Sequence, residues 1–91
     1  MGKKRTKLEV IRDILEVIKS RNGKIKPTHI LYKSNLSYGM MEEYMRDLLE
    51  KQFIVEHKTK EGKRYSITER GQQYLQKFNE IVEFTERFGL E

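Results

Sequence analysis

The apolar residues near the start of the chain recur with the period of an α-helix. They return at steps of three and four and predict an amphipathic helix from Lys7 to Ser20. Thr6, followed three residues later by Glu9, has the form of a capping box that starts this helix. The Asn-Gly pair at 22–23 tolerates the left-handed backbone of a helix exit and predicts its end. The apolar positions are Leu8, Ile11, Ile14, Leu15 and Ile18.

Two further helices are expected in the middle of the chain. A proline suits the first turn of a helix, where its missing N–H is not needed, so a short helix is predicted from Pro27 to about Lys33. The three residues 24–26 before it favour a short strand. After a tight turn at 34–37, Ser37 caps a third helix from Tyr38 to about Lys51. Its apolar face consists of Met41, Tyr44, Met45, Leu48 and Leu49.

The period shortens to about two beyond the third helix, which predicts a β-hairpin. Residues 53–58 and 64–67 form its strands, and the polar segment 59–63, which contains a glycine, forms its tip. Three helices followed by a hairpin are the order of a winged helix-turn-helix. The sequence therefore predicts an α+β, mostly helical winged helix-turn-helix domain over residues 7–67, with a basic arm at 1–6.

The segment 68–89 predicts a long C-terminal helix that is used for dimerisation. Its apolar positions repeat with the four-three spacing of a coiled coil, and at roughly 30 Å it is longer than the domain can cover. Tyr74, Leu75 and Phe78 are expected to close the domain's own core. The alternative is a helix that folds back over that core. The side chains predicted at the dimer interface are Phe78, Ile81, Val82, Phe84, Thr85 and Phe88.

The composition excludes several classes of protein. A chain of 91 residues allows one small domain, and without cysteine it has neither disulfides nor thiolate metal sites. Its two histidines, His29 and His57, are too few for a histidine-rich metal site, and no catalytic arrangement or phosphate loop is present. No apolar run approaches the length of a membrane span. We expect a cytoplasmic protein that is not an enzyme, with no metal, cofactor or evident small-molecule ligand.

The net charge of +5 is unevenly distributed along the chain. Residues 1–36 hold 10 basic and 3 acidic side chains, a local charge of +7, whereas residues 37–91 hold 9 basic and 11 acidic ones, a local charge of −2. A second basic cluster lies around the predicted hairpin tip. Such an asymmetric basic surface is typical of proteins that bind polyanions.

Three blocks carry a resemblance to a known family. They are KLEVIRDIL at 7–15, ILYKSNLSY at 30–38 and GKRYSITERG at 62–71. The chain from about residue 3 to residue 80 resembles the archaeal 10a-type winged-helix DNA-binding proteins and related small archaeal transcriptional regulators. The resemblance implies a DNA-binding winged helix that dimerises through antiparallel pairing of its last helices. The last helix here is shorter than is usual in that family.

In a winged helix the third helix lies in the major groove of DNA with its first turn nearest the bases. The residues expected to face the groove are Ser34, Ser37, Tyr38, Met40 and Arg46, with Lys33 beside them. From Tyr38 to Lys51, however, four acidic residues outnumber two basic ones, which argues against strong base recognition. The alternative is a solvated face held by the pairs Glu42–Arg46 and Asp47–Lys51.

The hairpin and the arm are better candidates for phosphate contact. The hairpin contributes Lys58, Lys60, Lys63 and Arg64, and the arm contributes Lys3, Lys4 and Arg5. The alternatives are an ordinary solvated turn and a disordered solubilising tail.

The sequence thus predicts a homodimeric winged-helix protein that binds double-stranded DNA, as a transcriptional regulator or a nucleoid-associated, chromatin-type architectural protein. A second hypothesis is a protein–protein interaction module that uses the acidic third helix. A lipid-anchored protein is a third hypothesis, because Met1 to Thr6 matches a loose myristoylation pattern.

Overall fold

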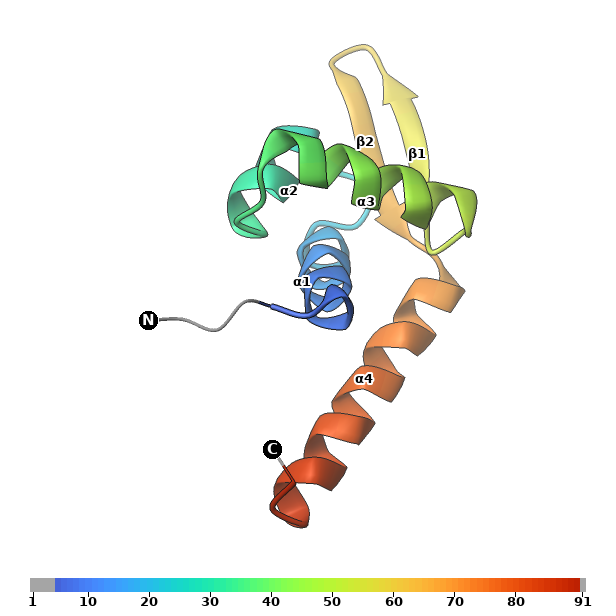
Figure 1. Cartoon of the computed structure of the whole chain (residues 1–91). Helices are drawn as coiled ribbons and strands as arrows, with labels where there is room; N and C mark the ends of the chain where they lie inside the picture. Colours follow the sequence, from blue (N-terminus) through green and yellow to red (C-terminus); the bar gives the residue numbers. More distant parts are fainter. Residues whose placement is uncertain (1–4, 91) are drawn as a thin grey trace.

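Four helices and one antiparallel hairpin make up residues 5–90, the part of the chain that the computed structural model describes. Figure 1 shows the hairpin projecting from one side of the helical body and the last helix leaving it in another direction. This is the predicted mostly helical α+β fold, a winged helix-turn-helix. The elements in chain order are α1 (Lys7–Ser20), α2 (Pro27–Lys33), α3 (Tyr38–Glu50), β1 (Ile54–Thr59), β2 (Gly62–Ile67) and α4 (Glu69–Arg87).

Local capping interactions fix the starts of three helices. At α1 the predicted capping box is present, since the N–H of Glu9 donates to Thr6 Oγ1 at 3.1 Å and the N–H of Thr6 donates to Glu9 Oε1 at 2.8 Å. These hydrogen bonds lower the pKa of the Glu9 carboxyl. Ser37 and Thr68 cap α3 and α4 without the reciprocal bond, since their side chains accept from the N–H groups of Met40 and Gly71. α3 ends at Glu50, one residue earlier than predicted.

The hairpin is more regular than the sequence predicts. Its strands pair from Ile54 opposite Ile67 to Thr59 opposite Gly62, so the expected five-residue tip shrinks to a turn at Lys60 and Glu61. Thr59 Oγ1 donates to the Gly62 carbonyl at 2.7 Å and accepts from the Glu61 N–H at 3.2 Å. These contacts hold the turn closed, which is why the basic side chains stand on strands instead of on a loose loop.

The connection between α1 and α2 binds the hairpin along β2. Ile25 forms an isolated antiparallel bridge with Tyr65, in place of the predicted short strand. The Gly23 N–H donates to the Tyr65 carbonyl at 2.9 Å, and Asn22 Oδ1 accepts from the Ile67 N–H at 2.7 Å. Gly23 has φ +81°, a left-handed conformation that glycine adopts at little cost.

The core lies where α1 meets the other elements. Ile14, Leu15 and Ile18 of α1 are fully buried, with Ile30 of α2 against them. Leu8 is different: the helical period assigns it to the buried stripe, yet it is 59% exposed, whereas Val10 of the same turn is buried, so the buried face of α1 begins at Val10. The remaining core residues come from α1, the α1–α2 connection, α3, the hairpin and α4: Val10, Ile25, Met41, Met45, Leu48, Ile54, Tyr65, Ile67 and Leu75.

α4 is anchored to the domain only along its first half. Leu75 is buried, and the Tyr74 hydroxyl donates to the Leu8 carbonyl of α1 at 2.8 Å. Beyond Phe78 none of the described residues of α4 is buried. Figure 1 shows the second half of the helix extending away from the body of the domain. The alternative of a helix folded back over the core does not apply.

Gly71 in the first turn of α4 packs directly against the hairpin and is expected to tolerate no side chain. A Cβ at this position would collide with the Phe53 carbonyl oxygen and lie 2.6 Å from Ile67 Cγ1. Gly71→Ala should therefore lower the free energy of unfolding by about 1–3 kcal/mol, as measured by chemical denaturation. Gly39→Ala is the matched control, because nothing lies within 4 Å of its Cβ position. Equal stability of the two variants would contradict the close packing.

Candidate nucleic-acid interface

The first turn of α3 is open to solvent. Ser37 Oγ accepts from the Met40 N–H at 3.3 Å, and Tyr38 and Met40 are exposed beside it. One turn further on, hydrogen bonding to the Glu42 carboxylate raises the pKa of the Tyr38 hydroxyl. The phenol therefore remains protonated at neutral pH. This turn offers hydroxyl groups and apolar surface, but no positive charge.

The acidic face of α3 is only partly held by the ion pairs expected from its sequence. Lys51 Nζ lies 3.0 Å from Asp47 Oδ1, and this contact lowers the pKa of the Asp47 carboxyl. The expected pair between Glu42 and Arg46 is absent among the described residues. Arg46 is thus an exposed cation on a helix that otherwise presents carboxylates.

A hollow of about 450 Å³ separates α3 from the hairpin. Arg46 and Lys63 bring positive charge into it from the two sides, and Glu42 and Glu56 bring negative charge. The formal charges of these four groups cancel. The hollow itself is therefore not a strongly positive site, and the basic character of the interface comes from the outer part of the hairpin.

Glu56 is the residue of this interface that the sequence analysis missed. Lys63 Nζ lies 3.9 Å from Glu56 Oε1, and the Tyr65 hydroxyl donates to the same oxygen at 3.4 Å. Burial raises the pKa of the Tyr65 hydroxyl, and the negative charge of Glu56 raises it further. The alternation of side chains along β1 indicates the inward position of Glu56, because Glu56 lies on the same face of the strand as the buried Ile54.

The outer part of the hairpin concentrates positive charge at close range. Lys58 lies directly opposite Lys63 in the strand register, and Lys60 lies in the turn two residues further on. Like charges directly opposite each other destabilise a sheet. Arg64 lies opposite His57 in the strand register. Its Nη1 donates to the Lys63 carbonyl at 2.9 Å, which keeps its guanidinium beside the hairpin. The predicted hairpin residues are therefore brought together on one projecting element.

Ser34 does not lie at the surface, contrary to the sequence prediction. It is the C-cap residue of α2, its N–H donates to the Ile30 carbonyl, and it is only 1% exposed. Its Oγ has no hydrogen-bond partner among the described residues. The prediction that Ser34 faces the groove is therefore wrong. Lys33, next to it, is exposed.

Arg5 is tied to the domain instead of belonging to a free arm. Its guanidinium lies 2.6 Å from Asp13 Oδ2 and also donates to the Asn35 carbonyl at 3.0 Å. The prediction of a basic arm at residues 1–6 needs correction, because Arg5 is bound to Asp13 and Asn35 and because Thr6 caps α1. Lys3 and Lys4 lie outside the described residues.

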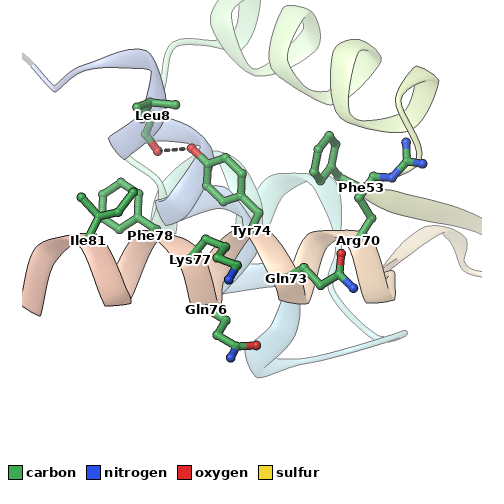
Figure 2. A pocket seen from close by; sticks show the side chains of 9 residues that line it. All are labelled: Leu8, Phe53, Arg70, Gln73, Tyr74, Gln76, Lys77, Phe78 and Ile81. Atoms are coloured by element: carbon green, nitrogen blue, oxygen red, sulfur yellow. Dashed lines mark hydrogen bonds between the residues drawn. The ribbon is translucent and has the colours of Figure 1, made fainter. Parts of the chain in front are cut away.

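A second hollow, of about 680 Å³, runs along α4 and is lined mainly by apolar side chains. Figure 2 shows Tyr74, Phe78 and Ile81 of α4 on one side of it and Leu8 of α1 on the other. Arg12 packs against the α4 side of this hollow, with its guanidinium carbon 4.9 Å from the centre of the Phe78 ring. Burial raises the pKa of Tyr74.

The second half of α4 presents an apolar stripe next to this hollow. Ile81, Phe84 and Phe88 are 59–64% exposed, and the rings of Phe84 and Phe88 lie 4.8 Å apart, centre to centre. Val82 and Thr85, also predicted at a dimer interface, are half-buried on the side nearer the domain. A contiguous apolar patch of this kind is unusual on a monomeric protein.

Other kinds of site are not found among the described residues. No group of three or more histidine or acidic side chains in residues 5–90 is placed to hold a metal ion. Within the same residues, no helix has both the length and the hydropathy required to cross a membrane.

Comparison with known proteins places this architecture in a family. A family model described as winged helix-turn-helix matches residues 4–86, which include all the described helices except the last residue of α4, together with the hairpin. The chain belongs to the winged helix-turn-helix family. Winged helix-turn-helix domains are binding modules, in agreement with the prediction that the protein is not an enzyme.

One curated relative of this winged helix-turn-helix chain is the Methanocaldococcus jannaschii protein MJ0290. It is 33% identical over 78 residues, which cover 86% of this chain. The chain spans about a third of the length of that relative, 34%.

Solved structures share the fold over most of the chain. Sso10a-2, a DNA-binding protein from Sulfolobus solfataricus, has a TM-score of 0.78 at 23% identity and covers 92% of this chain and 85% of its own. F-93 of SSV1 has a TM-score of 0.70 at 18% identity, with coverages of 97% and 95%. MepR of S. aureus has a TM-score of 0.68 at 15% identity, with coverages of 93% and 62%. The predicted resemblance to 10a-type winged helices is confirmed at the level of the fold.

The two serines around the turn before α3 are expected to respond oppositely to substitution. Ser34→Ala removes a buried hydroxyl that has no partner among residues 5–90, so the free energy of unfolding should stay the same or rise by about 1 kcal/mol. Ser37→Ala removes the cap of α3 and should lower it by about 0.5–2 kcal/mol. Thermal and chemical denaturation measure both effects. Clear destabilisation by Ser34→Ala would mean that its hydroxyl has a partner.

Proposed function

We propose that the protein binds double-stranded DNA as a winged-helix homodimer, either as a transcriptional regulator or as a chromatin-type architectural protein of the nucleoid in the cytoplasm. The observation that carries the proposal is the crowding of Lys58, Lys60 and Lys63 on the projecting hairpin, next to the exposed first turn of α3. A phosphate backbone relieves the repulsion among these lysines. The description of Sso10a-2 as a DNA-binding protein supports the same function.

The binding mode relies on phosphates more than on bases. Bidentate base recognition in the major groove uses Arg, Lys, Asn or Gln, and the outward face of α3 offers Arg46 among four carboxylates. Lysines on the hairpin instead supply point charges that suit phosphate oxygens. Affinity for duplex DNA then falls steeply with salt, and sequence preference is modest.

The exposed stripe of α4 supports dimerisation. In an antiparallel pair of helices that cross at Ile81, the partner's Phe84 meets Phe78 and the partner's Phe88 meets Tyr74, inside the hollow beside Leu8. Each of the exposed apolar side chains contributes about 1.5–3 kcal/mol when it becomes fully buried. A second copy is thus the occupant that fits both the hollow and the stripe.

The charges along α4 favour the antiparallel direction. Its first half, residues 69–78, carries Arg70 and Lys77 against Glu69, a charge of +1, whereas its second half, residues 79–87, carries three glutamates against Arg87, a charge of −2. Antiparallel pairing brings the basic half of each helix near the acidic half of the other, and parallel pairing would bring like charges together.

Reversing charge on the hairpin should weaken DNA binding. Lys60→Glu with Lys63→Glu removes two phosphate contacts per chain, four per dimer, so the slope of log affinity against log salt should become shallower by roughly four. Fluorescence anisotropy with a labelled duplex at several salt concentrations measures this slope.

Glu61→Lys is the matched control, because it changes the same turn in the opposite direction and should strengthen binding. The competing function, a protein-interaction module built on the acidic face of α3, is tested by Glu42→Lys with Glu43→Lys. These changes strengthen DNA binding if α3 lies near phosphates. If neither the hairpin reversals nor the α3 reversals alter DNA affinity, the proposed function is wrong.

Placing charge on the stripe of α4 should convert the dimer into a monomer. Phe84→Glu with Phe88→Glu puts four carboxylates in a dimer interface, yet both positions are exposed in the single chain, so the fold should persist. Light scattering should show the mass falling from twice 11.0 kDa to 11.0 kDa, with an unchanged circular dichroism spectrum.

Asn79→Glu provides the control for this pair. It introduces the same residue on α4 two positions before Ile81, which on a helix is nearly the opposite side, and should leave the dimer intact. A wild-type protein that is already monomeric at micromolar concentration would remove the dimer from the proposal without affecting DNA binding.

A further inference from the structure

The first turn of α3 holds two apolar side chains in solvent with a glycine between them. Tyr38 is 64% exposed and Met40 is 43% exposed, although both belong to the turn that lies next to the basic hairpin. The phosphate contacts proposed for the hairpin lysines use neither side chain. The turn is therefore available to a part of the DNA that offers apolar surface.

Tyr38 and Met40 lie on opposite sides of the outward ridge of α3. Tyr38 lines the hollow of about 450 Å³ toward the hairpin, together with Lys63. Met40 lines another hollow of about 450 Å³ toward the start of α1, together with Lys7. Because successive residues of a helix are about 100° apart, Gly39 lies between them on the ridge itself. We call this arrangement, with backbone as its floor and two apolar side chains as its walls, the Gly39 notch.

No contact within the described part of the chain explains why position 39 is a glycine. Its φ does not lie in the left-handed region, and nothing among residues 5–90 lies within 4 Å of the place where a Cβ would stand. Gly71, by contrast, packs against the Phe53 carbonyl oxygen. Glycine is disfavoured in helices relative to alanine, and it is often used where another molecule approaches the backbone closely. The missing side chain of Gly39 thus indicates such an approach.

The two hollows beside the ridge each include a weakly paired lysine. Lys63 Nζ lies 3.9 Å from Glu56 Oε1, and Lys7 Nζ lies 3.9 Å from Asp47 Oδ2; these are the longest ion-pair contacts among the described residues. Both lysines are exposed, so a phosphate can replace these contacts at little cost. An apolar centre between two cations matches a major groove, where the base edges lie between two phosphate backbones.

We propose that the Gly39 notch binds thymine methyl groups in the major groove, so that the protein prefers duplexes that present A·T pairs to the first turn of α3. The inference rests on the proposed function, because it requires α3 to enter the groove of a bound duplex. Thymine is the base whose major-groove edge carries a methyl group. Cytosine is the competing base, because its N4 group donates to carboxylates and Glu43 lies one turn further along the ridge. The apolar character of the first turn, which lies nearest the bases, favours thymine.

Thymine and deoxyuridine differ by this methyl group alone, which allows a direct test. The wild-type protein is titrated with labelled duplexes of alternating A·T or alternating A·U pairs, equal in length and charge, and fluorescence anisotropy is measured at a single salt concentration. Burial of one methyl group favours binding about fourfold. The A·U duplex should therefore bind more weakly by about fourfold for each methyl group that the notch contacts.

Variants of the notch show whether it is the source of this difference. Tyr38→Ala with Met40→Ala removes its walls, and Gly39→Gln fills it. Both variants should bind the A·T and A·U duplexes with affinities within about twofold of each other. Tyr32→Ala is the matched control, because it removes an aromatic side chain that is 77% exposed on α2, and it should retain the difference. Circular dichroism verifies that each variant is folded.

The proposal is overturned if the wild-type protein binds the A·T and A·U duplexes equally well. A difference that persists in the notch variants, or that Tyr32→Ala abolishes as well, also overturns it, because the difference would then arise from DNA shape or from another contact. Tighter binding of a G·C duplex that Glu43→Gln abolishes would assign the turn to cytosine and overturn the proposal. In all these outcomes the protein still binds DNA, whereas failure to bind any duplex overturns the proposed function as well.

Discussion

The arrangement of this domain depends on the way the α1–α2 connection pairs with β2. Through the backbone N–H of Gly23, the side-chain carbonyl of Asn22 and the buried Ile25, the helical half of the domain is joined to the hairpin by hydrogen bonds and by apolar packing. A two-stranded hairpin alone is marginally stable in water. Because the connection adds a third backbone contact at its base, the hairpin can project its lysines at a fixed angle to α3.

Positive and negative side chains are concentrated on different elements of the domain. The outer hairpin is positive, whereas α3 carries four carboxylates, and in the hollow between them Glu42 and Glu56 balance the charges of Arg46 and Lys63. A carboxylate near a phosphate costs affinity. In the proposed complex the acidic residues of α3 would therefore limit how tightly DNA is held, while the hairpin would supply long-range attraction that is sensitive to salt.

The sequence predicts those features of the fold that depend on neighbouring residues. The capping box of Thr6, the proline at the start of α2 and the change of period before β1 are local signals, and the structure confirms each of them. Ser34, Arg5 and Leu8 were misassigned because their environments depend on how the elements pack: Asp13 binds Arg5, Ser34 is buried at the end of α2, and Leu8 lines the hollow along α4 instead of the core. Glu56 was overlooked because only the strand register brings it beside Lys63.

The firm anchoring of the first half of α4 has a consequence for how such a domain can evolve. Tyr74 and Phe78 hold the helix to Leu8 and Arg12, so its direction relative to the rest of the domain is set before the chain reaches Ile81. Each residue inserted beyond Phe78 would lengthen this rod by about 1.5 Å and rotate its outer face by about 100°. α4 can therefore act as a ruler, and small insertions would change the distance and the relative rotation between two paired domains without altering any residue of α3 or the hairpin.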